Sequence, residues 1–311
     1  MNWMIFAFFG AIFQAFESAI KKKALQVKGM NNVVAVIAFF VAGALFALAY
    51  FLQEKTLMPT HNLSHLFWNA LIFGVVLNIV AVWFNYKALD VAQLSYLMPF
   101  MTLTSLSLII PPMILLGEYP SRTSLLGILI IVFGAILMDW KKNISLSMEE
   151  LKQRKNNRKG VLYFLATAAC YTFTPTLSKI TVVESGSVLF ASYLTHLLIA
   201  IGFIPLIFLT PIGRNYGESM KNIKSNLFAK SAWKFFIAIF FAGVAIAIAN
   251  GSTNHALQFA SVSSVFAIKR TMPLFAFVLG VLYFKERNNL SQKIIATTIM
   301  IIGAVIITVL K

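Results

Sequence analysis

Long apolar runs separated by short polar stretches extend along the whole chain. A helix rises about 1.5 Å per residue, so roughly 20 mostly apolar residues cross a bilayer core. Ten runs of about that length are present, at 2–20, 33–52, 66–86, 92–116, 121–139, 160–180, 187–209, 233–256, 261–284 and 292–310. The pattern predicts an all-α membrane protein with ten transmembrane helices.

The composition agrees with this prediction, because 59% of the residues are hydrophobic and only 12% are charged. A net charge of +16 would suggest nucleic-acid binding in a soluble protein, but here the basic residues lie mainly in the loops. The loops on one predicted side carry 20 Lys and Arg, and those on the other side carry four. Basic loops stay in the cytoplasm. We therefore expect a bacterial inner-membrane protein with outward termini and no nucleic-acid partner.

Two stretches of the chain, 88–118 and 256–286, resemble each other without a gap. Each begins with Ala-Leu and ends with Glu, and each is followed by a helix containing Gly-Ala-Ile or Gly-Ala-Val. The earlier parts align more weakly, with Lys21 opposite Lys179. An odd number of spans per repeat makes the two halves inverted in the membrane. We expect two inverted five-helix repeats, 1–140 and 160–311, joined by a basic connecting loop at 141–159.

The motif PLFAFVLGVLYFKE (Pro273–Glu286), the Gly-Glu pair at 117–118 and the glycine-containing final helix resemble the EamA-type drug/metabolite transporter superfamily. The resemblance implies a carrier in which the first, third, fourth, sixth, eighth and ninth helices line a central cavity, with the fifth and tenth outside. The first repeat departs from the motif, because Ser105 stands opposite Pro273. Many family members have cytoplasmic termini, whereas the charge distribution here predicts outward termini.

Two adjacent cations, Lys269 and Arg270, interrupt the predicted ninth span at a depth of about 13 Å. A charge at that depth costs about 2.5–3.5 kcal/mol on an insertion scale, so both side chains must face protein, water or a ligand. One interpretation is that they bind an anionic substrate, since a similar Lys-Arg pair of plastid triose-phosphate translocators holds the substrate's phosphate. The other is an ion pair with Glu17 that only holds helices together.

Polar side chains on other spans predict further contacts with a substrate. Asn250 and Asn254 lie one turn apart on the eighth span, where they either line a wet cavity or hydrogen-bond to a neighbouring helix. The other candidates for substrate binding are Tyr171, Asn85, Tyr96 and Trp83. Glu17 and His255 are the candidates for a coupled proton.

The sequence contains no recognisable nucleotide-binding loop, metal-ligand cluster or catalytic set. We therefore expect no enzyme activity, no cofactor and no metal. The leading hypothesis is a secondary carrier that moves a small polar or anionic metabolite by alternating access, with a coupled proton or counter-substrate as an option. The alternatives are an amino-acid or drug exporter with an aromatic, hydrogen-bonding cavity, a lipid-handling or scaffold protein, and a membrane-embedded enzyme.

Overall fold

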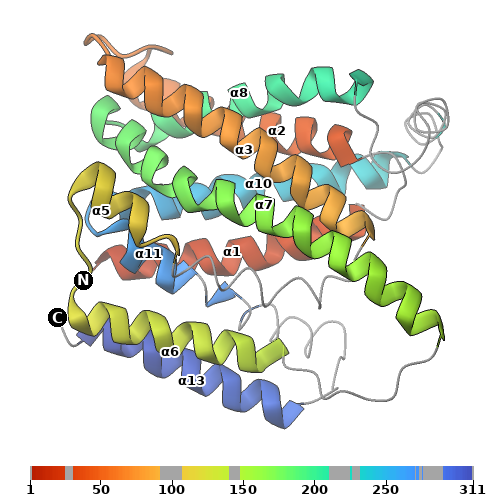
Figure 1. Cartoon of the computed structure of the whole chain (residues 1–311). Coiled ribbons are helices and arrows are strands. Elements are labelled where there is room, and N and C mark those ends of the chain that lie inside the picture. The colour runs from red at the N-terminus through yellow and green to blue at the C-terminus, as the bar shows by residue number, and fades with distance from the viewer. Residues whose placement is uncertain are drawn as a thin grey trace.

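The computed structural model describes residues 2–24, 31–91, 107–139, 148–209, 225, 232–269, 271–272, 275 and 290–309. Figure 1 shows the long helices side by side in one bundle, with α1 beginning and α13 ending on the same side. The described helices are α1 (Asn2–Ala24), α2 (Asn31–Glu54), α3 (His65–Val91), α5 (Ile110–Leu116), α6 (Arg122–Asp139), α7 (Met148–Ser185), α8 (Val188–Leu209), α10 (Ala232–Leu257), α11 (Val262–Lys269) and α13 (Leu290–Val309).

Five of these helices, α2, α3, α7, α8 and α10, are long and apolar enough to cross a membrane. Large apolar side chains cover the outside of the bundle; for example, Phe73 is 65% exposed, Leu162 68% and Ile114 75%. A soluble monomer rarely exposes so much apolar surface, whereas the hydrocarbon of a bilayer accommodates it. The described residues therefore form an all-helical membrane protein.

Helix α7 differs from the prediction at its beginning. It starts at Met148 and runs for 38 residues, so residues 148–159, expected within the connecting loop, form its first turns. The loop was predicted from polarity alone, but the sequence Met-Glu-Glu-Leu-Lys-Gln-Arg-Lys consists of strong helix formers. Pro175 lies inside α7, and the helix continues past it.

Four pairs of helices make the most extensive contacts, namely α1 with α10, α3 with α7, α2 with α8 and α6 with α13. The α6–α13 pair lies at one edge of the bundle in Figure 1. A Cβ atom on Gly134 would lie 2.9 Å from the Ala296 carbonyl oxygen, and one on Gly303 would lie 2.8 Å from that of Gly127. Small residues let membrane helices approach closely, so the two Gly-Ala motifs join α6 to α13.

Candidate functional site

Helix α11 buries Lys269, which is only 8% exposed. Its Nζ donates a hydrogen bond to Oδ1 of Asn250 on α10, at 3.4 Å. The same atom lies 5.3 Å from the ring centroid of Phe266, one turn earlier on α11. A buried ammonium requires polar partners. One partner of Lys269 is Asn250, which the sequence analysis predicted separately to bind substrate.

Asn250 also contacts His196, a residue of α8 that the sequence analysis missed. The Nδ2 atom of Asn250 lies 3.0 Å from Nε2 of His196, and Nδ1 of His196 lies 2.7 Å from the Ser192 carbonyl oxygen. His196 is 4% exposed. The sequence feature that could have identified His196 was a histidine inside the apolar run 187–209. A buried ionisable group in such a run is by default a candidate for function.

Asn254, one turn beyond Asn250, faces the same helix. Its Nδ2 donates to Oγ of Ser192 at 2.9 Å. The two asparagines of α10 thus bond to residues four positions apart on α8. This geometry matches the alternative of hydrogen bonding between helices for Asn254. Asn250 contacts both His196 of α8 and the Lys269 ammonium of α11, and so connects α8 to that cation.

A second polar cluster joins α3 to α7. Lys87 lies 3.5 Å from the ring centroid of Trp83 and 5.8 Å from that of Tyr163. The indole N–H of Trp83 is buried and finds no acceptor among the described residues. Trp83 was predicted to bind substrate, and a buried donor of this kind suits a ligand acceptor. Lys87 was missed because the predicted third span ended at residue 86.

The remaining predicted site residues have a less specific setting. Asn85 on α3 and Tyr171 on α7 are half-buried, on two helices that pack against each other. Arg270 and Tyr96 lie outside the described residues. Their assignment to the substrate site stays a prediction.

The two candidates for proton coupling lie on α1 and α10. Glu17 is half-buried on α1. His255 packs edge-to-face against Phe6 and Phe259, with centroid distances of 4.3 and 5.2 Å. These aromatic neighbours favour a packing role for His255. His196, rather than His255, is bonded to the predicted substrate residue Asn250.

An ion pair between Lys179 and Glu118 connects three segments at the side where α11 begins. Lys179 of α7 binds Oε1 of Glu118 and also donates to the Ala260 carbonyl oxygen at 2.7 Å. The other carboxylate oxygen of Glu118 accepts the backbone N–H of Val262 at 3.0 Å. The first N–H groups of a helix lack partners within the helix and favour negative charge. The described contacts place Glu118 at the beginning of α11.

Gly117 accounts for the position of Glu118. It ends α5 with a φ of 64°, in the left-handed region. Glycine enters this region without steric cost, and it is a common residue just past a helix end. The chain therefore turns at Gly117, and the next residue, Glu118, reaches Lys179. The Gly-Glu motif of the sequence has a local structural explanation.

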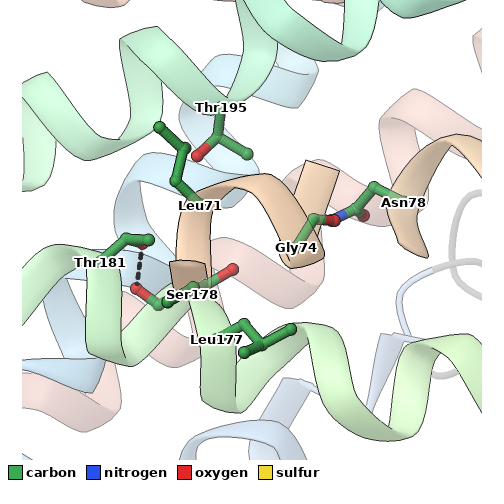
Figure 2. A pocket seen from close by; sticks show the side chains of 8 residues that line it. Leu71, Gly74, Asn78, Leu177, Ser178, Thr181 and Thr195 are labelled. Carbon is green, nitrogen blue, oxygen red and sulfur yellow. Dashed lines mark hydrogen bonds between the residues drawn. The ribbon is translucent and has the colours of Figure 1, made fainter. Parts of the chain in front are cut away.

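A small hollow lies between α3, α7 and α8, with a cavity volume of about 10 Å³. Figure 2 shows Asn78 of α3, Ser178 and Thr181 of α7 and Thr195 of α8 around it. Asn78 and Thr195 donate to backbone carbonyls of their own helices, Gly74 and Ala191. Binding sites for drug-sized ligands usually have about 300–1,000 Å³, so this hollow is too small for one. Among the described residues, no group of three or more metal-ligating side chains occurs.

Comparison with known proteins defines the class of this protein. The model of the EamA-like transporter family matches residues 1–139 and again 158–309. Together with the helical bundle, these matches define a multi-pass membrane transporter. The chain belongs to the EamA-like transporter family.

A solved structure titled "Crystal structure of protein" has a similar fold. The similarity covers 99% of this chain and 97% of that chain, with a TM-score of 0.74 and 14% sequence identity. At this identity the likeness concerns the fold alone. None of the curated proteins compared with the chain matches it in sequence.

Proposed function

We propose that the protein is a secondary carrier that moves a small anionic or polar metabolite across the bacterial inner membrane by alternating access. Ten spans form two inverted five-helix halves, and both termini face outward. The substrate lies between the halves, near the bilayer midplane. Lys269, with Arg270 beside it in the sequence, binds the anionic group.

The helix contacts support the inverted halves. If α1 to α6 correspond in order to α7 to α13, α1 is equivalent to α7 and α3 to α10. The α1–α10 contact then becomes the α7–α3 contact, while α2–α8 and α6–α13 map onto themselves. All four are the most extensive contacts of the bundle. The two matches of one family model, to residues 1–139 and 158–309, support the same division.

Individual residues follow the same correspondence. Residues 88–118 and 256–286 align with a shift of 168 positions, which makes Ala81 equivalent to Ala249. Thr167 of α7 donates to the Ala81 carbonyl oxygen at 3.3 Å. In the other half, a Cβ atom on Gly10 of α1 would lie 3.2 Å from the Ala249 carbonyl oxygen. The carbonyl oxygens of Ala81 and Ala249, equivalent by this alignment, thus lie against α7 and α1, which are equivalent by the same correspondence.

The choice of an anionic substrate rests on the burial of Lys269. Lys269 is 8% exposed, and its ammonium donates a hydrogen bond to the Asn250 amide oxygen. A buried ammonium attracts an anion strongly in a low-dielectric setting, so an anionic substrate would gain from contact with Lys269. This observation carries the proposal.

Ligand-dependent thermal stability of the purified protein tests it. The panel contains phosphorylated compounds, carboxylates, neutral and cationic amino acids, and hydrophobic drugs. A ligand that binds only the folded protein raises stability, by about 2.7 kcal/mol at a concentration of 100 Kd. We expect anions alone to stabilise the native protein and the exposed-site control Lys159→Gln, but not Lys269→Gln or Arg270→Gln. Equal stabilisation of all four by neutral amino acids or drugs would overturn the proposal.

That second outcome corresponds to the exporter alternative, which one observation favours. The buried indole N–H of Trp83 lies without an acceptor among the described residues, and the Lys87 ammonium lies near the rings of both Trp83 and Tyr163. An aromatic site with one donor suits an amino acid or drug. In that case Trp83→Phe, which removes only the N–H group, weakens the stabilising ligand, whereas Lys269→Gln does not.

A further inference from the structure

His196 is the buried ionisable group that the proposed substrate site does not use. It lies on α8 with 4% exposure, and Asn250 connects it to Lys269 on α11. The three side chains form a continuous chain of hydrogen bonds from an imidazole through an amide to an ammonium.

The directions of these bonds fix the proton on His196. The Ser192 carbonyl can only accept, so the Nδ1 atom of His196, 2.7 Å away, carries a hydrogen and donates. In the neutral imidazole the other nitrogen then has a lone pair. Nε2 accepts from Nδ2 of Asn250 at 3.0 Å, which leaves Oδ1 of the same amide to accept from Lys269 at 3.4 Å.

Adding a proton to His196 breaks this arrangement. The new N–H on Nε2 would face the NH₂ group of Asn250, and two donors cannot bond to each other. A half-turn of the amide restores that bond by presenting Oδ1 to His196. It then presents the NH₂ group to Lys269, so the ammonium loses this acceptor and faces another donor in its place.

We propose that His196 is a proton-binding site, and that the Asn250 amide couples its charge to Lys269. A neutral His196 keeps the amide oxygen on the ammonium, and a protonated His196 withdraws it. In the carrier proposed above, on which this last step rests, an anion at Lys269 replaces the withdrawn oxygen and offsets the added charge. The proton and the anion therefore favour each other's binding.

The other neighbours of His196 include aromatic and ionisable groups. Helix α2 faces it with Phe39 and Phe46, at ring centroid distances of 5.9 and 5.2 Å. Helix α10 faces it with Asn250, and the Lys269 ammonium of α11 lies beyond that amide. Helices α3 and α7 also pack against α8, and the ionisable groups of their membrane portions include Tyr86, Lys87, Tyr163, Cys170, Tyr171 and Lys179.

Ring ¹⁵N NMR of the purified full-length protein, labelled at histidine, tests the coupling. The His196 signal is assigned by its loss in His196→Gln. If that variant does not fold, replacement of His61, His65 and His255 by Gln leaves His196 as the single signal. We expect the neutral form to carry its hydrogen on Nδ1.

The coupling itself appears in the titration midpoint. In Lys269→Met, we expect the midpoint of His196 to move by about one pH unit to higher pH, because a cation joined to it through Asn250 is gone. Lys87→Met is the matched control and leaves the midpoint in place. A hydrogen on Nε2 in the neutral form, the lack of any titration, or equal midpoints in native protein and Lys269→Met would each overturn the proposal.

This experiment is independent of transport. A coupled His196 in a protein that binds no anion would contradict the proposed carrier function but not the coupling. An anion carrier with an uncoupled His196 would contradict the coupling alone.

Discussion

Two lysines of the helical bundle, the partly buried Lys179 and the buried Lys269, have different environments. Lys179 binds the carboxylate of Glu118 and a backbone carbonyl, and so joins α7 to the two turns at one end of the bundle. Lys269 lies deeper along α11, and the acceptor described for it is the uncharged amide of Asn250. A carboxylate neutralises the charge of a lysine, whereas an amide supplies an acceptor without a charge. We therefore expect a structural role for Lys179, and the proposal above assigns a binding role to Lys269.

The largest expected difference concerns stability. Lys179→Met leaves the Glu118 carboxylate partly buried without its cation, so we expect the free energy of unfolding to fall by about 3 kcal/mol. Lys269→Met removes one hydrogen bond to an amide and should cost about 1 kcal/mol. Denaturant unfolding in mild detergent measures both. The double variant Lys179→Met with Glu118→Gln should recover most of the loss.

An equally large fall in the free energy of unfolding in Lys269→Met would contradict the expected difference between the two lysines. It would mean that Lys269 holds helices together through an internal ion pair, as in the alternative with Glu17. Exchanging the charges, by Glu17→Lys together with Lys269→Glu, would then restore the fold and transport.

Ligand binding should show the reverse order of effects. In Lys269→Gln, we expect the affinity for the best anion of the panel to fall about 30-fold, or about 2 kcal/mol, as for loss of one partner of a buried charged pair. Lys159→Gln, at an exposed position of α7, is the control and keeps the affinity. Direct titration of the detergent-solubilised protein measures the Kd. An affinity unchanged in a folded Lys269→Gln protein would exclude this lysine from the substrate site.

Asn250→Asp should make Lys269 resemble Lys179. The new carboxylate would neutralise the ammonium from the position that Oδ1 occupies in the native protein. We expect the protein to fold and the anion affinity to fall about tenfold, or about 1.4 kcal/mol. Asn254→Asp places the same charge one turn away, opposite Ser192, and serves as the control. Equal losses in both variants would indicate general repulsion of the anion, rather than neutralisation of Lys269.

Much of this contrast could be predicted from the sequence, because it depends on local patterns. Apolar runs gave the positions of α1, α2, α3, α6, α8, α10 and α13 to within a few residues at most ends. The buried cation at Lys269 and the polar turn-spaced pair at Asn250 and Asn254 were also visible. The repeat of Ala-Leu and Glu identified Glu118 as a special position.

The rest depends on which faces of distant helices meet. His196 is one polar residue in an apolar run, and no local pattern shows that its face of α8 turns toward α10. That orientation follows from packing, in which Gly43 of α2 receives Leu197: a Cβ at Gly43 would lie 2.6 Å from Cδ2 of that leucine. The sequence analysis counted Lys179 among the basic residues of the outer side, although it lies inside α7. Its partner Glu118 is 61 positions away, so no local pattern showed the ion pair.

The smallest expected effect concerns the proposed inverted halves. Lys21 and Glu286 are the sequence counterparts of Lys179 and Glu118, and both side chains lie outside the described part of the protein. In a carrier with alternating access, equivalent positions of the two halves act on opposite faces. Lys179→Met should therefore favour the state open toward the side where α1 begins, and Lys21→Met the state open toward the other side.

We expect each to shift the ratio of the two states about fivefold, or about 1 kcal/mol. Labelling of Tyr171→Cys in a Cys170→Ala background, with a membrane-impermeant reagent applied from each side, measures the shift. A shift in the same direction for both lysines would mean that the Lys179–Glu118 pair stabilises the fold without selecting between the two states.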